Sequence, residues 1–491
     1  MKTTAGRIRN YRHPWRLRLA AILLGLLPFA MAEVGLHFLG LPRLPPPADP
    51  FVDLHNLRPL FTAQPNSGRL EISPERLQLF RPASFQVDKP AKTFRVFALG
   101  GSTTQGEPYS TETAFPEWMR LSLAAAAPGR RYEVINCGGI SYASYRVLAI
   151  LREVLQYSPD LIVVYTGQNE YLERRSYEGY YQQSWGNRVL SGLYGLRIVQ
   201  FARALTGDVA RRQEPLANNR TELEQEVEAL LDYRGGMAQY ERGAAWYGPV
   251  PQHFRWSLQQ MVAACQAVHV PLILVRPVTN LLDCPPLKIQ IDPSLSPASA
   301  EEFEEHWAAA KAAADEPADC LPHLQRALAI DSQHAGANFL LGRLQYDQKE
   351  YVAARQSLTR AKDNDVCPLR ATSAIQDIVS QVASEHQVLL LDAEALFAER
   401  SPHGIVGENW LMDHIHPTLA GHQLLGEELA RLCFRAGLAP SPPEDWQRRR
   451  QTLMAEHLSG LSEAYFHRGK QRLEGLLLWT QGRVQKVRDA P

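Results

Sequence analysis

The stretch FRVFALGGSTTQGEPYS, residues 94–110, decides the fold. Its first six residues are almost continuously apolar, which is typical of a strand that helices cover on both faces. Two glycines then permit a tight turn, and Ser102 follows at once. We therefore expect a buried parallel strand that presents Ser102 at the edge of a sheet, where ligands bind in open α/β folds. A serine in this position could also act only as the cap of the next helix.

Four further runs of the same kind lie at residues 132–136 (YEVIN), 161–166 (LIVVYT), 271–276 (PLILVR) and 388–392 (VLLLD). Helical stretches, such as the one that begins PEWMRLSLAAAA, separate them. Strands that alternate with helices predict a doubly wound, flavodoxin-like α/β domain with three layers, α/β/α. The 491 residues of the chain leave room for this domain and for additional parts.

The composition disfavours several classes of protein. In this chain 52 basic residues balance 52 acidic ones, and the sequence pI is about 7.3. A nucleic-acid-binding protein would carry a basic excess, so no nucleic-acid partner is expected. The six cysteines form no CxxC pair, which argues against a zinc ribbon or a redox motif. In an oxidising compartment some of Cys265, Cys284, Cys320, Cys367 and Cys433 could form disulfides, and the sequence does not say which.

The amino terminus resembles an export signal. Residues 1–18 are basic and contain no acid, and residues 19–41 are mainly apolar. Positive residues before an apolar segment keep the amino terminus in the cytoplasm and send the following chain across the membrane. We expect residues 19–41 to be a transmembrane signal anchor, because about 20 apolar residues span a bilayer; the alternative is a signal peptide cleaved after Ala32. The protein would then be a single-pass inner-membrane protein with its catalytic domain in the periplasm or outside the cell.

The rest of the chain is predicted to contain a linker, an α/β domain in two parts, an insertion and a tail. The linker and lead-in segment covers residues 42–90, the two parts of the α/β domain cover 91–298 and 369–440, and a helical tail covers 441–491. The insertion, residues 299–368, contains Ala327 and Ala361, which are 361 − 327 = 34 residues apart. This is the period of the tetratricopeptide repeat (TPR), so we expect a TPR-like helical insertion that docks a protein partner. An ordinary helical hairpin is the alternative.

Three of the later strands are followed by residues that suit acyl transfer. NCGG places Gly138 at the sheet edge, and YTGQN places Asn169 there. An asparagine amide can donate a hydrogen bond to an oxyanion, alongside backbone N–H groups. The last run leads to MDHIHP, in which Asp413 could orient His416 as a base. Asp413, His414 and His416 are also metal-ligand types, but the sequence supplies no further ligand cluster, so neither a metal nor a cofactor is expected.

Together these motifs resemble the SGNH, or GDSL-type, hydrolase family over residues 93–276 and 388–437. The resemblance implies that Ser102 is the nucleophile, His416 the base and Asp413 the acid of a catalytic triad. It also implies an oxyanion hole formed by the N–H groups of Ser102 and Gly138 and by the Asn169 side chain. The chain departs from the family pattern because GGST replaces the GDS core and a glutamate follows Asn169 where Asp is common. Its layout is closer to membrane-anchored bacterial members with repeat insertions.

The expected function is that of a serine esterase that cleaves an ester, with O-acetyl as the expected group, through an acyl-enzyme. A first alternative is an O-acetyltransferase that modifies an envelope or secreted polysaccharide, because a sugar hydroxyl can replace water as the acceptor. A second alternative is a weakly active or inactive scaffold that docks envelope partners through the insertion. Asn280 and Arg370 are candidate substrate-binding residues, and the ester-bearing substrate could be a carbohydrate.

Overall fold

The computed structural model describes residues 14–39, 49–54, 57–65, 67–177, 196–205, 221–232 and 235–481. The chain divides into two compact units. The smaller unit comprises Met1–Asp53 and Arg175–Leu223, and the larger unit comprises Leu54–Arg174 and Glu224–Pro491. All five predicted strands and all candidate catalytic residues belong to the larger unit.

The smaller unit contains a long apolar helix. Helix α1, Pro14–Phe38, includes Trp15–Leu36, the one helix among the described residues that is long and apolar enough to cross a membrane. A cleavable signal sequence has the same properties, so both predictions for this segment stand. The Glu33 carboxylate accepts hydrogen bonds from the N–H groups of Arg197 and Ile198 at 2.7 and 2.9 Å. The other described elements of this unit are α7 (Arg197–Leu205) and the parallel pair β1 (Val52–Asp53) and β8 (Thr221–Glu222).

The core of the larger unit is a five-stranded sheet in which all pairs are parallel. Its strands are β5 (Thr93–Gly100), β6 (Arg131–Gly138), β7 (Leu161–Tyr165), β9 (Leu272–Arg276) and β10 (Leu389–Asp392). They lie in the order β10-β9-β7-β5-β6. Read from the β6 edge and numbered along the chain, this is 2-1-3-4-5, the flavodoxin-like order. The predicted strands and the parallel α/β fold class are confirmed.

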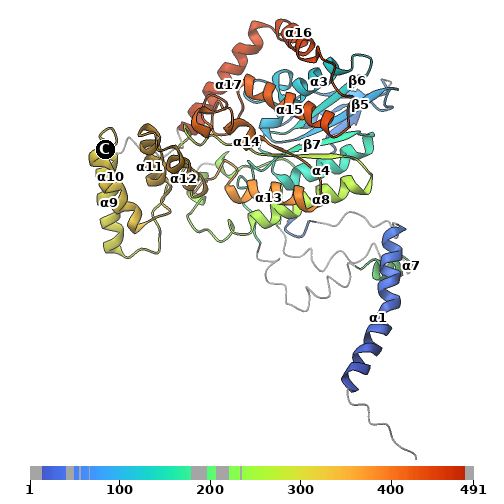
Figure 1. Cartoon of the computed structure of the whole chain (residues 1–491), viewed down its shortest axis with the longest axis horizontal. Helices are drawn as coiled ribbons and strands as arrows, with labels where there is room; N and C mark the ends of the chain where they lie inside the picture. The colour runs from blue at the N-terminus through green and yellow to red at the C-terminus, as the bar shows by residue number, and fades with distance from the viewer. Residues whose placement is uncertain are drawn as a thin grey trace, which may run out of the picture. The chain divides into compact units, whose positions relative to one another are not determined.

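Helices cover both faces of this sheet, as Figure 1 shows. The helices on one face are α3 (Phe115–Ala126) and α15 (Leu419–Arg435), and those on the other are α4 (Ser144–Val154), α8 (Val250–Ala267) and α13 (Ser373–Glu385). At Gly426, where α15 crosses α3, an added Cβ would lie 2.5 Å from Trp118 Cβ and 2.6 Å from Met119 N. Glycine is therefore required for this close crossing.

The predicted linker and lead-in segment, residues 42–90, contains a small folded sheet. Strands β2 (Phe61–Ala63), β3 (Arg69–Ile72) and β4 (Ser84–Gln86) form an antiparallel sheet in the order β2-β3-β4. The rings of Phe61 and Phe85 meet Phe97 of β5 edge to face, with centroids 6.3 and 5.3 Å apart. This small sheet therefore packs on the hydrophobic core of the larger unit and lies within the predicted lead-in segment.

The insertion consists of four consecutive helices. They are α9 (Pro297–Ala312), α10 (Pro317–Ile330), α11 (Ala335–Asp347) and α12 (Tyr351–Asp363). The two alanines that suggested a repeat, Ala327 and Ala361, are buried. At Gly342 an added Cβ would lie 2.7 Å from Leu358 Cγ, so α11 and α12 approach closely. The helical character of the insertion agrees with the sequence, and its identification as TPR-like stays a prediction.

The predicted tail forms two helices, α16 (Trp446–Ser459) and α17 (Glu463–Gln481). Short elements complete the described chain: α2 (Ser102–Gln105), α14 (Ala393–Ala398) and the 3-10 helices η1 (Pro74–Arg76), η2 (Thr111–Thr113), η3 (Leu155–Tyr157), η6 (Leu230–Asp232), η7 (Gly236–Gln239) and η8 (Pro402–Gly404). All six cysteines lie within the described residues, and none of them forms a disulfide. The disulfides that the sequence allowed are therefore not present.

Candidate active site

Ser102 begins helix α2 directly after β5, at the carboxyl edge of the sheet. Two side chains fasten this turn to β6. The Asn136 side-chain amide donates to the Thr104 carbonyl at 2.7 Å, and the Gln105 amide donates to the Gly138 carbonyl at 2.9 Å. Ser102 is 9% exposed, so most of the residue is shielded from solvent.

The loop that precedes α15 carries Asp413 and His416, and residues 413–416 are called the acid–base loop below. Asp413 Oδ1 accepts hydrogen bonds from the N–H groups of Ile415 and His416, both at 2.8 Å, so the side chain stabilises its own turn. The Met412 N–H donates to the His416 carbonyl at 2.8 Å and closes the loop. Thr418 then caps α15, with its side chain accepting from the N–H of the first turn. This arrangement leaves Asp413 Oδ2 to meet the imidazole.

The fold brings Ser102, His416 and Asp413 into one hydrogen-bonded relay. His416 Nε2 lies 2.8 Å from Ser102 Oγ, although the two residues are 314 positions apart in the chain. His416 Nδ1 lies 2.6 Å from Asp413 Oδ2. Because the carboxylate can only accept, Nδ1 carries the proton and Nε2 is left to accept the hydroxyl proton of Ser102. These separations are those of a nucleophile, its base and the acid that orients the base.

The electrostatics of the relay support proton transfer to His416. Burial disfavours the charged form of Asp413, but the nearby imidazoles of His416 and His414 and the hydrogen bonds from His416 outweigh it and hold the pKa of Asp413 well below its ordinary value. Burial also disfavours the imidazolium of His416, yet the charge and hydrogen bond of Asp413, aided by Glu107, outweigh it and raise the pKa of His416. An ionised Asp413 would therefore stabilise a positive charge on the His416 imidazole.

Asn169 lies beside the turn that carries Ser102, at the place expected for an oxyanion donor. Its amide nitrogen donates to the Tyr142 carbonyl at 3.0 Å, and the residue is buried. An added Cβ at Gly101 would lie 2.5 Å from this nitrogen, so the amide packs directly against the residue before Ser102. This close approach leaves no room for a side chain at position 101. The second hydrogen on the nitrogen and the Ser102 N–H are the donors that could face an oxyanion.

Gly138 does not fit the predicted role in the oxyanion hole. Its N–H donates to the Asn136 side-chain carbonyl at 2.9 Å and is therefore already used. An added Cβ at Gly138 would lie 2.2 Å from the Gln105 nitrogen, so this glycine allows α2 to pack on the end of β6. The prediction that Gly138 donates to the oxyanion is therefore corrected: Gly138 supports the turn that carries Ser102 by close packing.

Asn280 and Arg370 are buried, and their side chains donate hydrogen bonds to backbone carbonyls. Each is 3% exposed. The Asn280 side-chain amide donates to the Asp413 carbonyl at 3.1 Å, and one guanidinium nitrogen of Arg370 donates to the Asn280 carbonyl at 2.8 Å. Both residues therefore lie beneath the acid–base loop, and the prediction that they line the substrate pocket is corrected.

Two further histidines near the loop are buried and neutral. Burial lowers the pKa of His414 to about 4 and the pKa of His422 to about 3. His422 Nδ1 accepts the Phe115 N–H at 3.3 Å, which packs α15 onto α3. Among the described residues, no group of three or more His, Cys, Asp and Glu side chains is arranged to hold a metal ion.

Glu107 is a residue of the site that the sequence did not single out. Its N–H donates to the Ser102 carbonyl at 3.1 Å. Its carboxylate forms ion pairs with Arg81 and, at 3.5 Å, with Arg472 of α17, and it contributes to the raised pKa of His416. Glu107 belongs to the stretch that decides the fold, but only the structure shows that its charge acts on the base.

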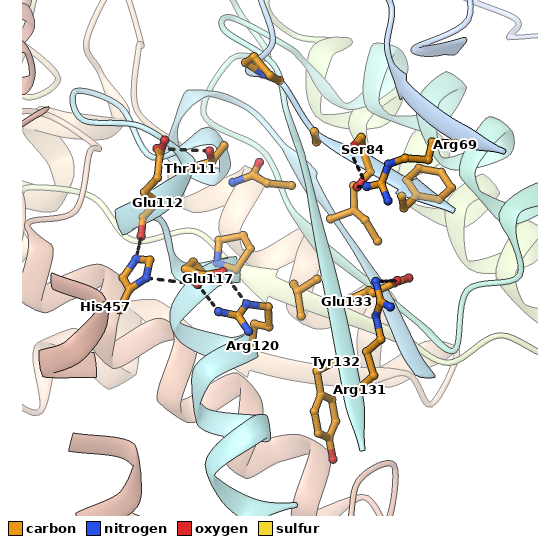
Figure 2. A pocket seen from close by; sticks show the side chains of 17 residues that line it. Arg69, Ser84, Thr111, Glu112, Glu117, Arg120, Arg131, Tyr132, Glu133 and His457 are labelled. Carbon is orange, nitrogen blue, oxygen red and sulfur yellow. Dashed lines mark hydrogen bonds and ion pairs between the residues drawn. The ribbon is translucent and has the colours of Figure 1, made fainter. Parts of the chain in front are cut away.

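A cavity of about 440 Å³ lies away from the relay, along β6 (Figure 2). Its walls come from β3, β4, β6, η2, α3 and α16, and they include none of the three relay residues. Figure 2 shows Glu117 between Arg120 and His457. The Glu117 carboxylate lies 2.5 Å from a guanidinium nitrogen of Arg120 and 3.7 Å from His457 Nδ1. The acyl-transfer geometry is therefore independent of this cavity.

No family model and no curated protein matches this sequence. Several solved structures are similar to parts of it at low identity. The lipase/acylhydrolase from Enterococcus faecalis is 14% identical, with 70% of this chain and 96% of that chain covered and a TM-score of 0.31. A catalytic mutant of an acetylxylan esterase from Geobacillus stearothermophilus is 14% identical, with 70% and 93% covered and a TM-score of 0.30. Likeness at this level does not identify a function, which has to come from the site itself.

Proposed function

We propose that this chain is a serine esterase of the SGNH type that cleaves an O-acetyl ester through an acyl-enzyme. The observation that carries the proposal is the relay from Ser102 Oγ through His416 to Asp413, with separations of 2.8 and 2.6 Å. Burial of all three side chains keeps water from competing for their hydrogen bonds. Asn169 and the Ser102 N–H complete the set of groups that acyl transfer needs.

In the proposed reaction His416 Nε2 removes the hydroxyl proton as Ser102 Oγ attacks the ester carbonyl. The resulting oxyanion is stabilised by the Ser102 N–H and the Asn169 amide. The imidazolium, held by the Asp413 carboxylate, then gives its proton to the leaving alcohol, and the C–O bond breaks to leave an acetyl-Ser102. Water, deprotonated by the same imidazole, releases acetate and restores the serine.

The proposal is tested with a fluorophosphonate probe and with p-nitrophenyl acetate. We expect wild-type protein to be labelled at Ser102, and we expect Ser102→Ala and His416→Ala to abolish both labelling and turnover. Ser122→Ala is the matched control, because Ser122 is equally a buried helical serine whose hydroxyl donates to the Trp118 carbonyl on α3. A well-folded wild-type protein that remains unlabelled would instead favour the scaffold function.

We further propose that the catalytic unit is exported and tethered by α1. The support is the apolar segment Trp15–Leu36 of this helix, whose side chains are not buried. The test is to express the full chain in a bacterium and to follow it in membrane and soluble fractions. Retention in the membrane after carbonate washing, with the carboxyl-terminal part accessible to external protease in spheroplasts, is the expected result; release of a shortened soluble protein would indicate a cleaved signal peptide.

A further inference from the structure

The segment that follows β9 forms the underside of the acid–base loop. The Asn280 backbone N–H donates to the His414 carbonyl at 3.1 Å, and its side-chain amide donates to the Asp413 carbonyl at 3.1 Å. Its side-chain oxygen accepts the Asp283 N–H at 2.9 Å. One buried residue therefore holds two successive carbonyl groups of the loop and fixes its own turn at the same time.

Asn280 is itself held on the side away from the loop. Arg370 Nη1 donates to the carbonyls of Asn280 and Cys284 at 2.8 and 2.7 Å. The N–H groups of Leu281 and Leu282 donate to the Val406 carbonyl at 3.0 and 3.1 Å. The segment that begins at Asn280 is thus hydrogen-bonded to Val406, which precedes the acid–base loop, and to the buried guanidinium of Arg370.

The position of these bonds matters for the proton relay. The Asp413 carbonyl belongs to the residue whose carboxylate meets His416 Nδ1 at 2.6 Å. If the peptide groups on either side of His414 shift, the Asp413 side chain rotates with them and the short bond to the imidazole lengthens. Misplacement of a reacting group by about 1 Å can lower a rate about 10²-fold.

We propose that Asn280 is a positioning residue for the acid–base pair, acting through Asp413 and with no contact to substrate. This inference rests on the proposed serine-hydrolase function. It differs from simple core packing in one measurable respect. Because Asp413 contributes more than Glu107 to raising the pKa of His416, a loosened Asp413 lowers that pKa. A general loss of stability leaves it unchanged.

The test measures the rate of fluorophosphonate labelling of the full chain as a function of pH. In this reaction the Ser102 Oγ–P bond forms, the P–F bond breaks, fluoride leaves and the hydroxyl proton passes to His416. We expect Asn280→Ala to label about 10–100-fold more slowly than wild type and to reach half its maximal rate at a lower pH. Asn280→Asp keeps the acceptor for Asp283 and loses the donor to Asp413, so we expect it to label as slowly as the alanine variant.

Asn338→Ala provides the matched control. Asn338 is also a buried asparagine, and its amide donates to the carbonyls of Ser332 and His334 at 2.9 and 3.1 Å within the insertion. We expect this variant to lose stability and to keep the wild-type labelling rate and pH midpoint.

Equal rates and pH midpoints for Asn280→Ala and Asn338→Ala would overturn the positioning role. If Asn280→Ala does not fold, Arg370→Lys is measured in its place, with a fall in rate and midpoint expected and an unchanged profile overturning the inference. A wild-type protein that is not labelled at all would overturn both the proposed function and the role of Asn280. A wild-type protein that is labelled, with unaffected variants, would overturn the positioning role alone.

Discussion

Replacement of Asp413 by asparagine is the sharpest test of the relay. The side-chain oxygen that remains in Asp413→Asn could still accept the two loop N–H groups that Asp413 Oδ1 accepts at 2.8 Å, so the loop should keep its shape. The other carboxylate oxygen, 2.6 Å from His416 Nδ1, becomes an NH₂ group. This group donates to Nδ1, moves the imidazole proton to Nε2 and leaves no acceptor for the Ser102 hydroxyl. Loss of the correct tautomer lowers kcat roughly 10⁴-fold, or about 5 kcal/mol in activation free energy at about 1.36 kcal/mol for each factor of ten.

The assay is initial-rate hydrolysis of p-nitrophenyl acetate by the purified protein, with thermal unfolding measured in parallel. Asp331→Asn is the control, because Asp331 is also a buried acid, and it pairs with Arg242 and not with a relay residue. We expect this control to lose stability and to keep its turnover number. If Asp413→Asn retained a tenth or more of the wild-type kcat, the relay would not be the catalytic device and the reasoning from geometry would be refuted.

Contacts and pKa directions give three further predictions. Gly101→Ala places a Cβ 2.5 Å from the Asn169 amide nitrogen. We therefore expect kcat to fall about 10²-fold, as when an oxyanion donor is lost. Gly129→Ala is the control, because its added Cβ meets nothing within 4 Å, and we expect it to leave kcat unchanged. The pKa of His416 is raised, and the base must be neutral to act. We therefore expect kcat/KM to rise with pH and to reach half its maximum above a pH of about 6.5, the ordinary pKa of histidine. A midpoint below that pH would contradict the assignment of Asp413 as the partner of His416. Gly426→Ala forces α15 away from α3, and calorimetry should show a loss of about 1–3 kcal/mol in unfolding free energy.

The sequence was informative about the fold where hydrophobicity is continuous. The run at residues 94–99 became β5, Thr93–Gly100, and the run at 388–392 became β10, Leu389–Asp392, because strands buried on both faces tolerate few polar residues. The small sheet β2-β3-β4 was missed because its strands are short and exposed on one side. The burial of Phe61 and Phe85 depends on Phe97, a contact that local pattern does not contain.

For the site, the sequence indicated the types of the functional residues but not the contacts that decide their roles. Ser102, Asp413 and His416 could be proposed from their types and from the strands they follow, because carboxyl ends of parallel strands meet at one edge. The role of Gly138 was mispredicted because the availability of its N–H depends on where the Asn136 side chain turns. Asn280 was misassigned for a similar reason: only the fold shows that the segment after β9 lies under the acid–base loop.

Different parts of the chain hold the two halves of the relay, Ser102 on one side and the His416–Asp413 pair on the other. The Ser102 turn is fastened to β6 of the central sheet, through Asn136. The acid–base loop rests on the segment that begins at Asn280, and Asp283 of that segment pairs with Arg343 on helix α11 of the insertion at 2.9 Å. This ion pair joins the insertion to the segment beneath Asp413 and His416. We therefore expect a partner that displaces α11 to shift the pH profile of the reaction before it lowers the reactivity of Ser102 at high pH.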